Sequence, residues 1–149
     1  MKRHTSLIPL SHDHHISLLL ALMLMKDAPA LKGMPTEPKL KAEHIKNHYD
    51  THLIKHFELE EKVLFPFVKG RDKEMDAVIE ELINEHRAIA KSVSSMSEAP
   101  DLNEHLQNLG ELLDQHIRKE ERVLFERIPE LFSEEELKSL EKLIPQSEF

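Results

Sequence analysis

The sequence contains no cysteine and no tryptophan, and only 3 of its 149 residues are glycine. Without cysteine, the chain can form no disulfide, and it can supply no thiolate for catalysis, for a zinc finger or for an iron–sulfur cluster. So few glycines, together with abundant Leu, Glu and Lys, favour long helices over sheet. The sequence therefore predicts an all-α protein whose chemistry depends on side chains other than cysteine.

The sequence also lacks an excess of positive charge and a long apolar run. Its formal net charge is −8, and an acidic surface does not attract polyanions, so neither nucleic acid nor a membrane is an expected partner. The longest apolar run, Ile16 to Met25, is interrupted by Ser17 and is about half as long as a bilayer span. No export signal opens the chain, and the default expectation is a cytoplasmic protein.

Capping residues and prolines divide the chain into four long predicted helices. Ser11 is a candidate cap for the first helix, and Pro66 and Pro129 are candidate stops for the second and the fourth. Four long helices with short or moderate connections fit an up-down-up-down four-helix bundle, whose core accepts metal sites built from facing side chains. The predicted helices run from Ser11 to about 26, from about 40 to 65, from about 72 to 97 and from about 101 to 127.

A shorter helix is expected after the bundle. Ser133 and Glu136 have the spacing of a capping box, which predicts a fifth helix over about residues 133–144, packed outside the bundle. The length of 149 residues fits a single domain. We therefore predict one domain over residues 1–149, with the bundle at about 7–128.

Two stretches of the sequence resemble each other. Residues 56–65 read His-Phe-Glu-Leu-Glu-Glu-Lys-Val-Leu-Phe, and residues 116–125 read His-Ile-Arg-Lys-Glu-Glu-Arg-Val-Leu-Phe. A fainter similarity relates Asp13-His14 to Glu85-His86. This repetition predicts two helical hairpins paired about a pseudo-twofold axis, with similar side chains face to face.

The second predicted helix carries an ionisable pair on its apolar face. Because a helix advances about 100° per residue, His56, Glu60 and Val63 lie within about 40° of one another, whereas Glu61 lies about 100° or more away. A histidine and a glutamate four residues apart are separated by only about 6 Å along the axis. The pair can therefore contribute to one small cluster.

The fourth predicted helix repeats this arrangement. His116, Glu120 and Val123 share its apolar face, and Glu121 lies far around the helix. His86 is central on the apolar face of the third helix, among neighbours that are all apolar. Each of these helices therefore directs at least one histidine toward the core.

The sequence contains 11 histidines, and most of the others are expected to lie outside the core cluster. In the first helix His14 centres on the apolar face, whereas His15 lies about 100° and His12 about 160° away. His52 is one turn before His56, where it can donate to a ligand or line an access path, although simple packing is the expected role.

Two carboxylates and four imidazoles in an apolar core cost several kcal/mol per charge unless each charge is neutralised. No lysine or arginine shares these inward faces. Imidazole with carboxylate suits iron, and manganese and zinc are alternatives. The pattern predicts a two-metal centre held by His14, His56, Glu60, His86, His116 and Glu120.

These motifs resemble those of the hemerythrin-like family, also described as HHE cation-binding domains. The resemblance covers about residues 7–128. It implies a four-helix bundle in which the six residues bind two iron ions bridged by both glutamates and an oxygen atom. It rests on Asp13-His14, on His56 through Glu60 with Val63-Leu64-Phe65-Pro66, on Glu85-His86-Arg87, and on His116 through Glu120 with Val123-Leu124-Phe125.

The pattern departs from that of the oxygen-carrying hemerythrins. Those proteins have a second histidine one turn away on the third helix, where this chain has Leu82 and Ala90 around His86, and they end with a His-x-x-x-x-Asp pair. The four-histidine, two-glutamate set resembles instead the sites of bacterial iron-centre repair proteins. Those proteins usually carry an amino-terminal segment with cysteine, which this sequence lacks.

Three functional hypotheses follow. The leading one is a binding protein that takes oxygen or a related small ligand, such as nitric oxide or peroxide, for storage, sensing or protection. The second is a di-iron enzyme that reduces peroxide or nitric oxide, although no separate acid–base group is evident. The third is an iron donor or iron sensor for iron-centre repair. A binding protein is favoured over an enzyme, and the oligomeric state is left open.

Overall fold

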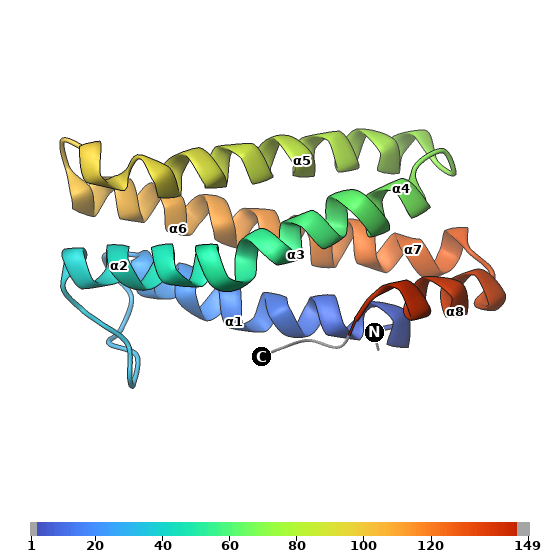
Figure 1. Cartoon of the computed structure of the whole chain (residues 1–149), viewed down its shortest axis with the longest axis horizontal. Helices are drawn as coiled ribbons and strands as arrows, with labels where there is room; N and C mark the ends of the chain where they lie inside the picture. Colours follow the sequence, from blue (N-terminus) through green and yellow to red (C-terminus); the bar gives the residue numbers. More distant parts are fainter. Residues whose placement is uncertain (1–2, 146–149) are drawn as a thin grey trace.

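The computed structural model describes residues 3–145, and every regular element in that range is helical (Figure 1). Residues 1–2 and 146–149 of the predicted domain lie outside the described residues. Four long helices run alternately in opposite directions, and a short fifth helix follows them. The predicted all-α bundle with an additional carboxyl-terminal helix is therefore confirmed.

The long helices are composed of several segments because short 3-10 and π turns interrupt the α-helical pattern. The first contains η1 (Thr5–Leu7) and α1 (Ile8–Leu24). The second contains α2 (Pro38–His48), η2 (Tyr49–Leu53), α3 (Ile54–Leu59), η3 (Glu60–Leu64) and α4 (Phe65–Val68). The third is α5 (Lys73–Ser94), followed by the turn η4 (Met96–Glu98). The last elements are α6 (Leu102–Lys119), η5 (Glu120–Leu124), α7 (Phe125–Leu131) and α8 (Glu134–Leu143).

The starts of the later helices follow from their capping residues. The Asp72 side chain accepts a hydrogen bond from a backbone amide in the first turn of α5, and Asp101 does the same for α6. Ser133 and Glu136 form the predicted capping box at the start of α8. These local signals depend only on neighbouring residues, which is why the sequence is sufficient to recognise them.

The predicted cap at Ser11 is wrong. The first helix begins two turns earlier, at Thr5, where the His4 side chain accepts a hydrogen bond from the amide of Ser6. Ser11 lies inside α1 and donates its hydroxyl to Glu121 on the fourth long helix. A hydroxyl that looks like a local cap is thus used in a contact between distant parts of the chain.

The first helix is also the most apolar. The segment Thr5–Leu24 is long and apolar enough to cross a membrane by length and composition alone, and 44% of its most apolar window is buried in the bundle. His14 lies in the middle of this segment and is buried. That the chain has no membrane partner therefore stays a prediction.

The two prolines predicted to end helices do not end them. Pro66 directly follows the π turn η3 inside the second long helix, and this helix continues to Val68. Pro129 lies inside α7, which continues to Leu131. Each proline removes a backbone donor, but packing of the helix against its neighbours keeps the chain helical.

The segments η3 and η5 begin at the two glutamates of the predicted metal set. In η3 the amide of Phe65 donates to the carbonyl of Glu60, and in η5 the amide of Phe125 donates to that of Glu120. This i to i+5 bonding places an additional residue in the turn. The positions after each glutamate are therefore rotated relative to a regular α-helix.

That rotation corrects two predictions. Val63 and Val123 were expected to face the core with the histidines, but Val63 is only half-buried and Val123 is 39% exposed. The next residues, Leu64 and Leu124, are fully buried instead. The regular helical period is valid from each histidine to its glutamate, and it fails just beyond each glutamate.

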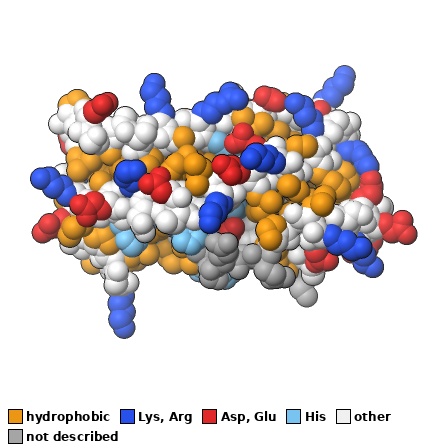
Figure 2. Space-filling model, in the orientation of Figure 1, with side chains coloured by type: hydrophobic (Ala, Val, Ile, Leu, Met, Phe, Trp, Pro, Cys, Tyr) orange, Lys and Arg blue, Asp and Glu red, His pale blue; other side chains and the backbone are white. Residues whose placement is uncertain are grey.

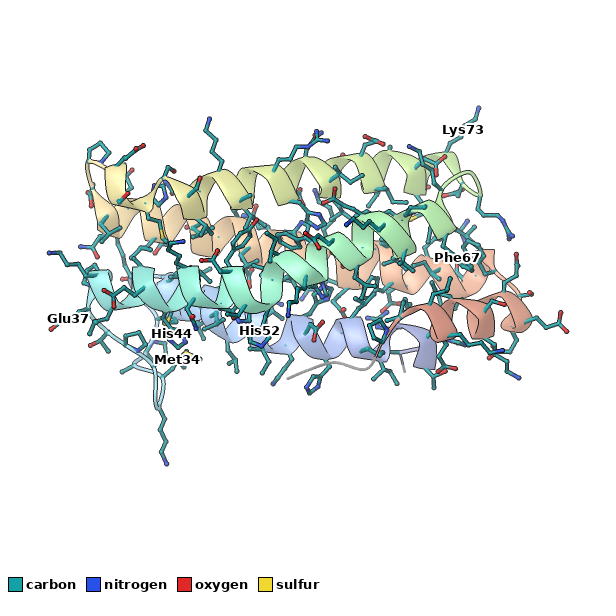
Figure 3. All side chains as sticks on the ribbon, viewed as in Figure 1. Met34, Glu37, His44, His52, Phe67 and Lys73 are labelled. Carbon is teal, nitrogen blue, oxygen red and sulfur yellow. The ribbon has the colours of Figure 1, made fainter. Side chains whose placement is uncertain are left out.

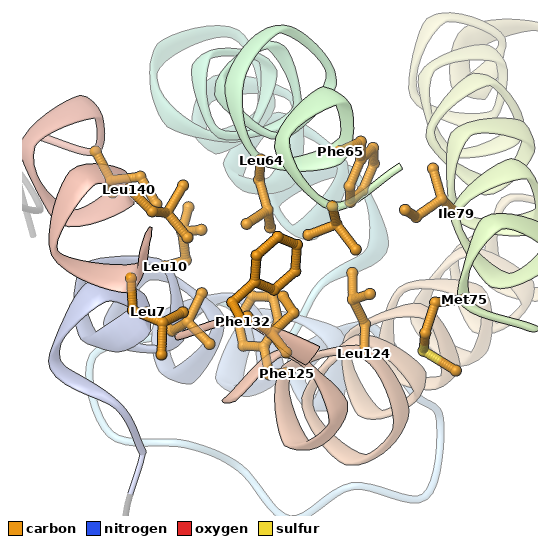
Figure 4. Close-up of a cluster of buried hydrophobic side chains, with 14 of the residues drawn as sticks. Leu7, Leu10, Leu64, Phe65, Met75, Ile79, Leu124, Phe125, Phe132 and Leu140 are labelled. Atoms are coloured by element: carbon orange, nitrogen blue, oxygen red, sulfur yellow. The ribbon is translucent and has the colours of Figure 1, made fainter. Parts of the chain in front are cut away.

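Two apolar clusters lie at opposite ends of the bundle, and the six ionisable residues lie between them along the helices. Figure 4 shows the cluster near α8, where Leu140 packs beside Leu7 and Leu10. The other cluster includes Leu20, Ile89 and further residues near the opposite end. The helix α8 thus closes one end of the core.

Charged side chains cover the outside of the bundle. On the face in Figure 2, acidic and basic side chains are mixed, with hydrophobic side chains between them. Glu37 and Lys73, at opposite ends of the molecule, point away from the helices in Figure 3. Most charged side chains thus lie in solvent, whereas the ionisable residues of the cluster are buried among the core side chains.

Gly110 marks the closest approach of α6 to α1. An added Cβ at this position would lie 2.8 Å from the carbonyl oxygen of Ala21 and 3.1 Å from the Cβ of Leu24. Because backbone and branched side-chain atoms cannot move aside easily, only glycine fits here.

We predict that Gly110→Ala destabilises the protein. Alanine improves helix propensity by about 1 kcal/mol, but overpacking a tight core costs about 1–3 kcal/mol, so the free energy of unfolding in a denaturant titration should fall. The control is Asn108→Ala, at an exposed position of the same helix, which should leave that free energy unchanged or slightly higher. A more stable Gly110→Ala protein would contradict the close contact.

Candidate metal centre

Four histidines and two glutamates meet in the middle of the bundle. All six side chains are buried, and both glutamates are completely inaccessible to solvent. Every long helix contributes, so the site exists only when the bundle is assembled. The structure brings together all six residues predicted from the sequence: His14 of α1, His56 of α3, Glu60 of η3, His86 of α5, His116 of α6 and Glu120 of η5.

The six residues form two groups of four that share both glutamates. One group contains His14 and His56, and the other contains His86 and His116. Within each group, one candidate ligand atom per residue lies within 4.8 Å of the others. The arrangement provides two neighbouring candidate metal positions, each with four possible donors.

Each glutamate presents its two oxygens to different groups. Oε1 of Glu60 lies 3.1 Å from Nε2 of His86, and Oε2 lies 3.3 Å from Nε2 of His56. Oε1 of Glu120 lies 3.1 Å from Nε2 of His14, and Oε2 lies 3.5 Å from Nε2 of His116. Each carboxylate thus faces one imidazole of each group.

Six buried polar atoms of this cluster have no hydrogen-bond partner among the described residues: both carboxylate oxygens of Glu60, both of Glu120, and Nε2 of His86 and of His116. Nε2 of His86 is close to Glu60, but the angles are not those of a hydrogen bond. Buried charges without partners cost several kcal/mol each. Bound cations would satisfy all of these atoms at once.

The pair His14 and His56 gives the clearest sign of a cation position. Nδ1 of His14 lies 2.7 Å from Glu121, and Nδ1 of His56 lies 2.9 Å from Asp13. Since ionised carboxylates only accept hydrogen bonds, both Nδ1 atoms carry protons. The two Nε2 atoms then face each other with lone pairs at 3.1 Å. Such an arrangement requires a positive charge between the rings.

In the metal-free protein a proton takes this place. Burial alone lowers the pKa of His56, but the carboxylates of Glu60 and Asp13 raise it to about 9. Burial likewise raises the pKa of Glu60, but the His56 and His86 imidazoles lower it well below its usual range. Glu60 is therefore ionised, and metal uptake must displace a proton from His56.

The other two imidazoles are oriented in the same way. Nδ1 of His86 lies 2.8 Å from Glu61, and Nδ1 of His116 lies 2.8 Å from Glu85. Burial lowers the pKa of His116, although the Glu85 carboxylate opposes this effect. His116 is therefore neutral and already has the protonation state that a metal ligand requires.

A family model described as Hemerythrin HHE cation binding domain matches residues 4–128. The chain belongs to this family. No curated protein and no solved structure was found to match it. The HHE family binds cations, and the buried cluster of histidines and glutamates is a group that can hold them. The donor set and the family thus agree on a cation-binding HHE domain.

Sequence reasoning missed the four carboxylates that hold the imidazoles of this HHE domain. Each histidine pairs with an acid on a neighbouring long helix, in a closed ring around the bundle. Helical periodicity describes one helix at a time, so it placed Glu61 and Glu121 away from the core. A usable signal was present, because each acid is adjacent in sequence to a metal-site residue: Asp13 to His14, Glu61 to Glu60, Glu85 to His86 and Glu121 to Glu120.

Two of these carboxylates are themselves paired with cations. Lys119 donates a hydrogen bond to Glu85. Burial raises the pKa of Glu85, but His116 and Lys119 outweigh this effect, so the pKa is lowered. Arg3 donates to Glu121, whose pKa is lowered by His14 against the effect of burial. These contacts keep the acceptors ionised and the imidazoles fixed in one tautomer.

The remaining histidines lie outside the two groups of four among the described residues. His12 and His15 are exposed, and His105 donates to the carbonyl of Ser92 at 2.7 Å. The ring of His52 stacks on that of His48 with centroids 5.5 Å apart. His44 and His52 are labelled on α2 and η2 in Figure 3.

His48 is buried, and its Nε2 lies 3.3 Å from the hydroxyl of Ser17. Burial, followed by the neighbouring His52 and His44, lowers its pKa to about 4. This histidine is therefore neutral near pH 7. The packing role was expected for His52, but the buried histidine in this part of the second helix is His48.

We predict that Glu61→Ala weakens metal binding, since the His86 ring loses its hydrogen-bond acceptor. Loss of such an acceptor typically reduces metal affinity by about 10–100-fold. The matched control is Glu58→Ala, an exposed glutamate one turn earlier, which should bind as the unaltered protein does. Affinities would be measured by competition with a chromophoric chelator. Equal affinities of the two variants would contradict an orienting role for Glu61.

A second prediction concerns stability with and without metal. Glu60→Met removes a buried charge without partners, so the thermal midpoint of the metal-free protein should rise. The same change removes a donor from both groups, so added metal should no longer stabilise the variant, whereas it should raise the midpoint of the unaltered protein. Scanning calorimetry measures both effects. Full stabilisation of the variant by metal would rule out a bridging position for Glu60.

Proposed function

We propose that this protein holds two iron ions and reversibly binds oxygen or a related small ligand, such as nitric oxide or peroxide, for storage, sensing or protection. The observation that carries the proposal is the symmetric donor set, in which each position receives two imidazoles and one oxygen from each glutamate. When bound, iron would supply open coordination positions and a change of oxidation state.

Iron is supported by the chemistry of the donors. Four imidazoles and two carboxylates suit iron, and the absence of cysteine leaves no thiolate for a soft-metal site. The protein side chains fix the geometry, since all four Nδ1 atoms have carboxylate partners that hold each ring in place. The free Nε2 atoms are thereby aimed at the metal positions.

The surroundings of the cluster exclude water. Phe125 stacks on His14 with ring centroids 5.4 Å apart, and Phe65 stacks on His86 at 5.8 Å. Phe57 also stacks on His86, with ring centroids 3.8 Å apart. An apolar shell of this kind limits access of solvent, which favours reversible binding of a small ligand over loss of the metal or of a reduced state.

The test is the absorption spectrum of the reduced, iron-loaded protein. We expect new charge-transfer bands when oxygen or nitric oxide is added, and a return to the starting spectrum when the ligand is removed. Glu60→Met, which should not load, is the control and should show no response. A spectrum that does not change with either ligand would refute the proposal. Sustained consumption of nitric oxide or peroxide with added reductant would indicate the enzyme hypothesis instead.

A further inference from the structure

A pocket of about 440 Å³ opens on the surface between the second long helix and α5, and His86 of the cluster is part of its lining. Phe57 and Glu61 line it from the second long helix, and His86 and Ala90 line it from α5. His86 is one of the six residues of the cluster, and it is nearly inaccessible to solvent. The pocket therefore ends against a metal-site imidazole.

The side chain of Phe57 lies between this pocket and the imidazoles of the candidate metal centre. Its ring stacks on the His86 imidazole with centroids 3.8 Å apart and an interplanar angle of 14°. The same ring meets the edge of His116 at 5.6 Å. Phe57 thus touches both imidazoles of one metal position, and rotation of this side chain would open a path to them.

The pseudo-twofold repeat is broken at this place. Ile117 occupies the position that corresponds to Phe57. The corresponding carboxylate, Glu121, is 22% exposed and binds Arg3 and Ser11 as well as His14. Glu61 is 39% exposed and faces the pocket. Of the two candidate metal positions, the one held by His86 and His116 is therefore the more accessible from the pocket.

The pocket is suited to an uncharged ligand. Its rim carries two cations, Lys62 and Arg87, and two carboxylates, Glu58 and Glu61. Opposite charges in equal number give little net attraction for an ion. The inner wall near Phe57 is apolar, which favours small neutral molecules.

We infer that this pocket is the entry port through which a neutral diatomic molecule reaches the metal position of His86 and His116, and that Phe57 is its gate. The inference rests on the proposed function and adds to it a route, a gate and a preferred metal position. Although the donor set is symmetric, the ligand thus reaches the metal position of His86 and His116 and not that of His14 and His56.

The first experiment uses the metal-free protein and dissolved oxygen as a fluorescence quencher. The sequence has no tryptophan, so Phe57→Trp and Phe65→Trp each introduce a single fluorophore. Both residues stack on His86, but only Phe57 lines the pocket. We expect oxygen to quench Phe57→Trp several-fold faster than Phe65→Trp. Equal quenching rate constants would overturn the port.

The second experiment measures nitric oxide binding to the reduced, iron-loaded protein by stopped flow. Ala90→Trp fills the pocket one turn after His86, and Leu18→Trp is the matched control one turn after His14. We expect Ala90→Trp to slow association and dissociation of nitric oxide several-fold with unchanged affinity. The reason is that an obstructed route slows entry and exit by the same factor. Leu18→Trp should keep the original rates. An unchanged rate in Ala90→Trp, or slowing accompanied by lost affinity, would overturn the inference.

The two experiments separate the inference from the proposed function. If the unaltered iron-loaded protein gives no response to nitric oxide, the proposed function fails, and the quenching comparison alone decides whether the pocket admits small neutral molecules. If nitric oxide binds but Ala90→Trp does not slow it, the function stands and the port is wrong.

Discussion

The structure depends on two carboxylates held without solvent between four imidazoles. Glu60 and Glu120 are fully buried, and no lysine or arginine reaches them among the described residues. Their charges must therefore be balanced by protons on the imidazoles or by bound cations. In the metal-free chain a proton on His56 meets only part of this requirement. The requirement explains why a member of a cation-binding family places this cluster in its core.

The other features of the fold hold this cluster in place. Each long helix supplies one imidazole, and each imidazole is fixed by a carboxylate from a neighbouring helix. Apolar clusters on both sides of the site keep the helices in register, and α8 closes one end. The ring of four hydrogen bonds therefore links all four helices at the depth of the metal positions, so that bundle assembly and site formation are one event.

Much of this was available from the sequence because it depends on local spacing. Helical periodicity identified the six cluster residues, and the capping residues of α5, α6 and α8 located those helices. Periodicity failed where the backbone itself departs from an α-helix, so that Val63 and Val123 turn outward after the π turns. It also failed for contacts between helices, such as Ser11 with Glu121, because the partner of a side chain across the bundle is not encoded in the spacing along one helix.

The central claim is that two cations neutralise the buried glutamates. Anomalous diffraction from crystals of iron-loaded protein, recorded at the iron absorption edge, tests it most directly. The account predicts two peaks, one beside His14 and His56 and one beside His86 and His116, with Glu60 and Glu120 between them. A map with no peak at either position, or with the two carboxylates turned away from the peaks, would contradict it.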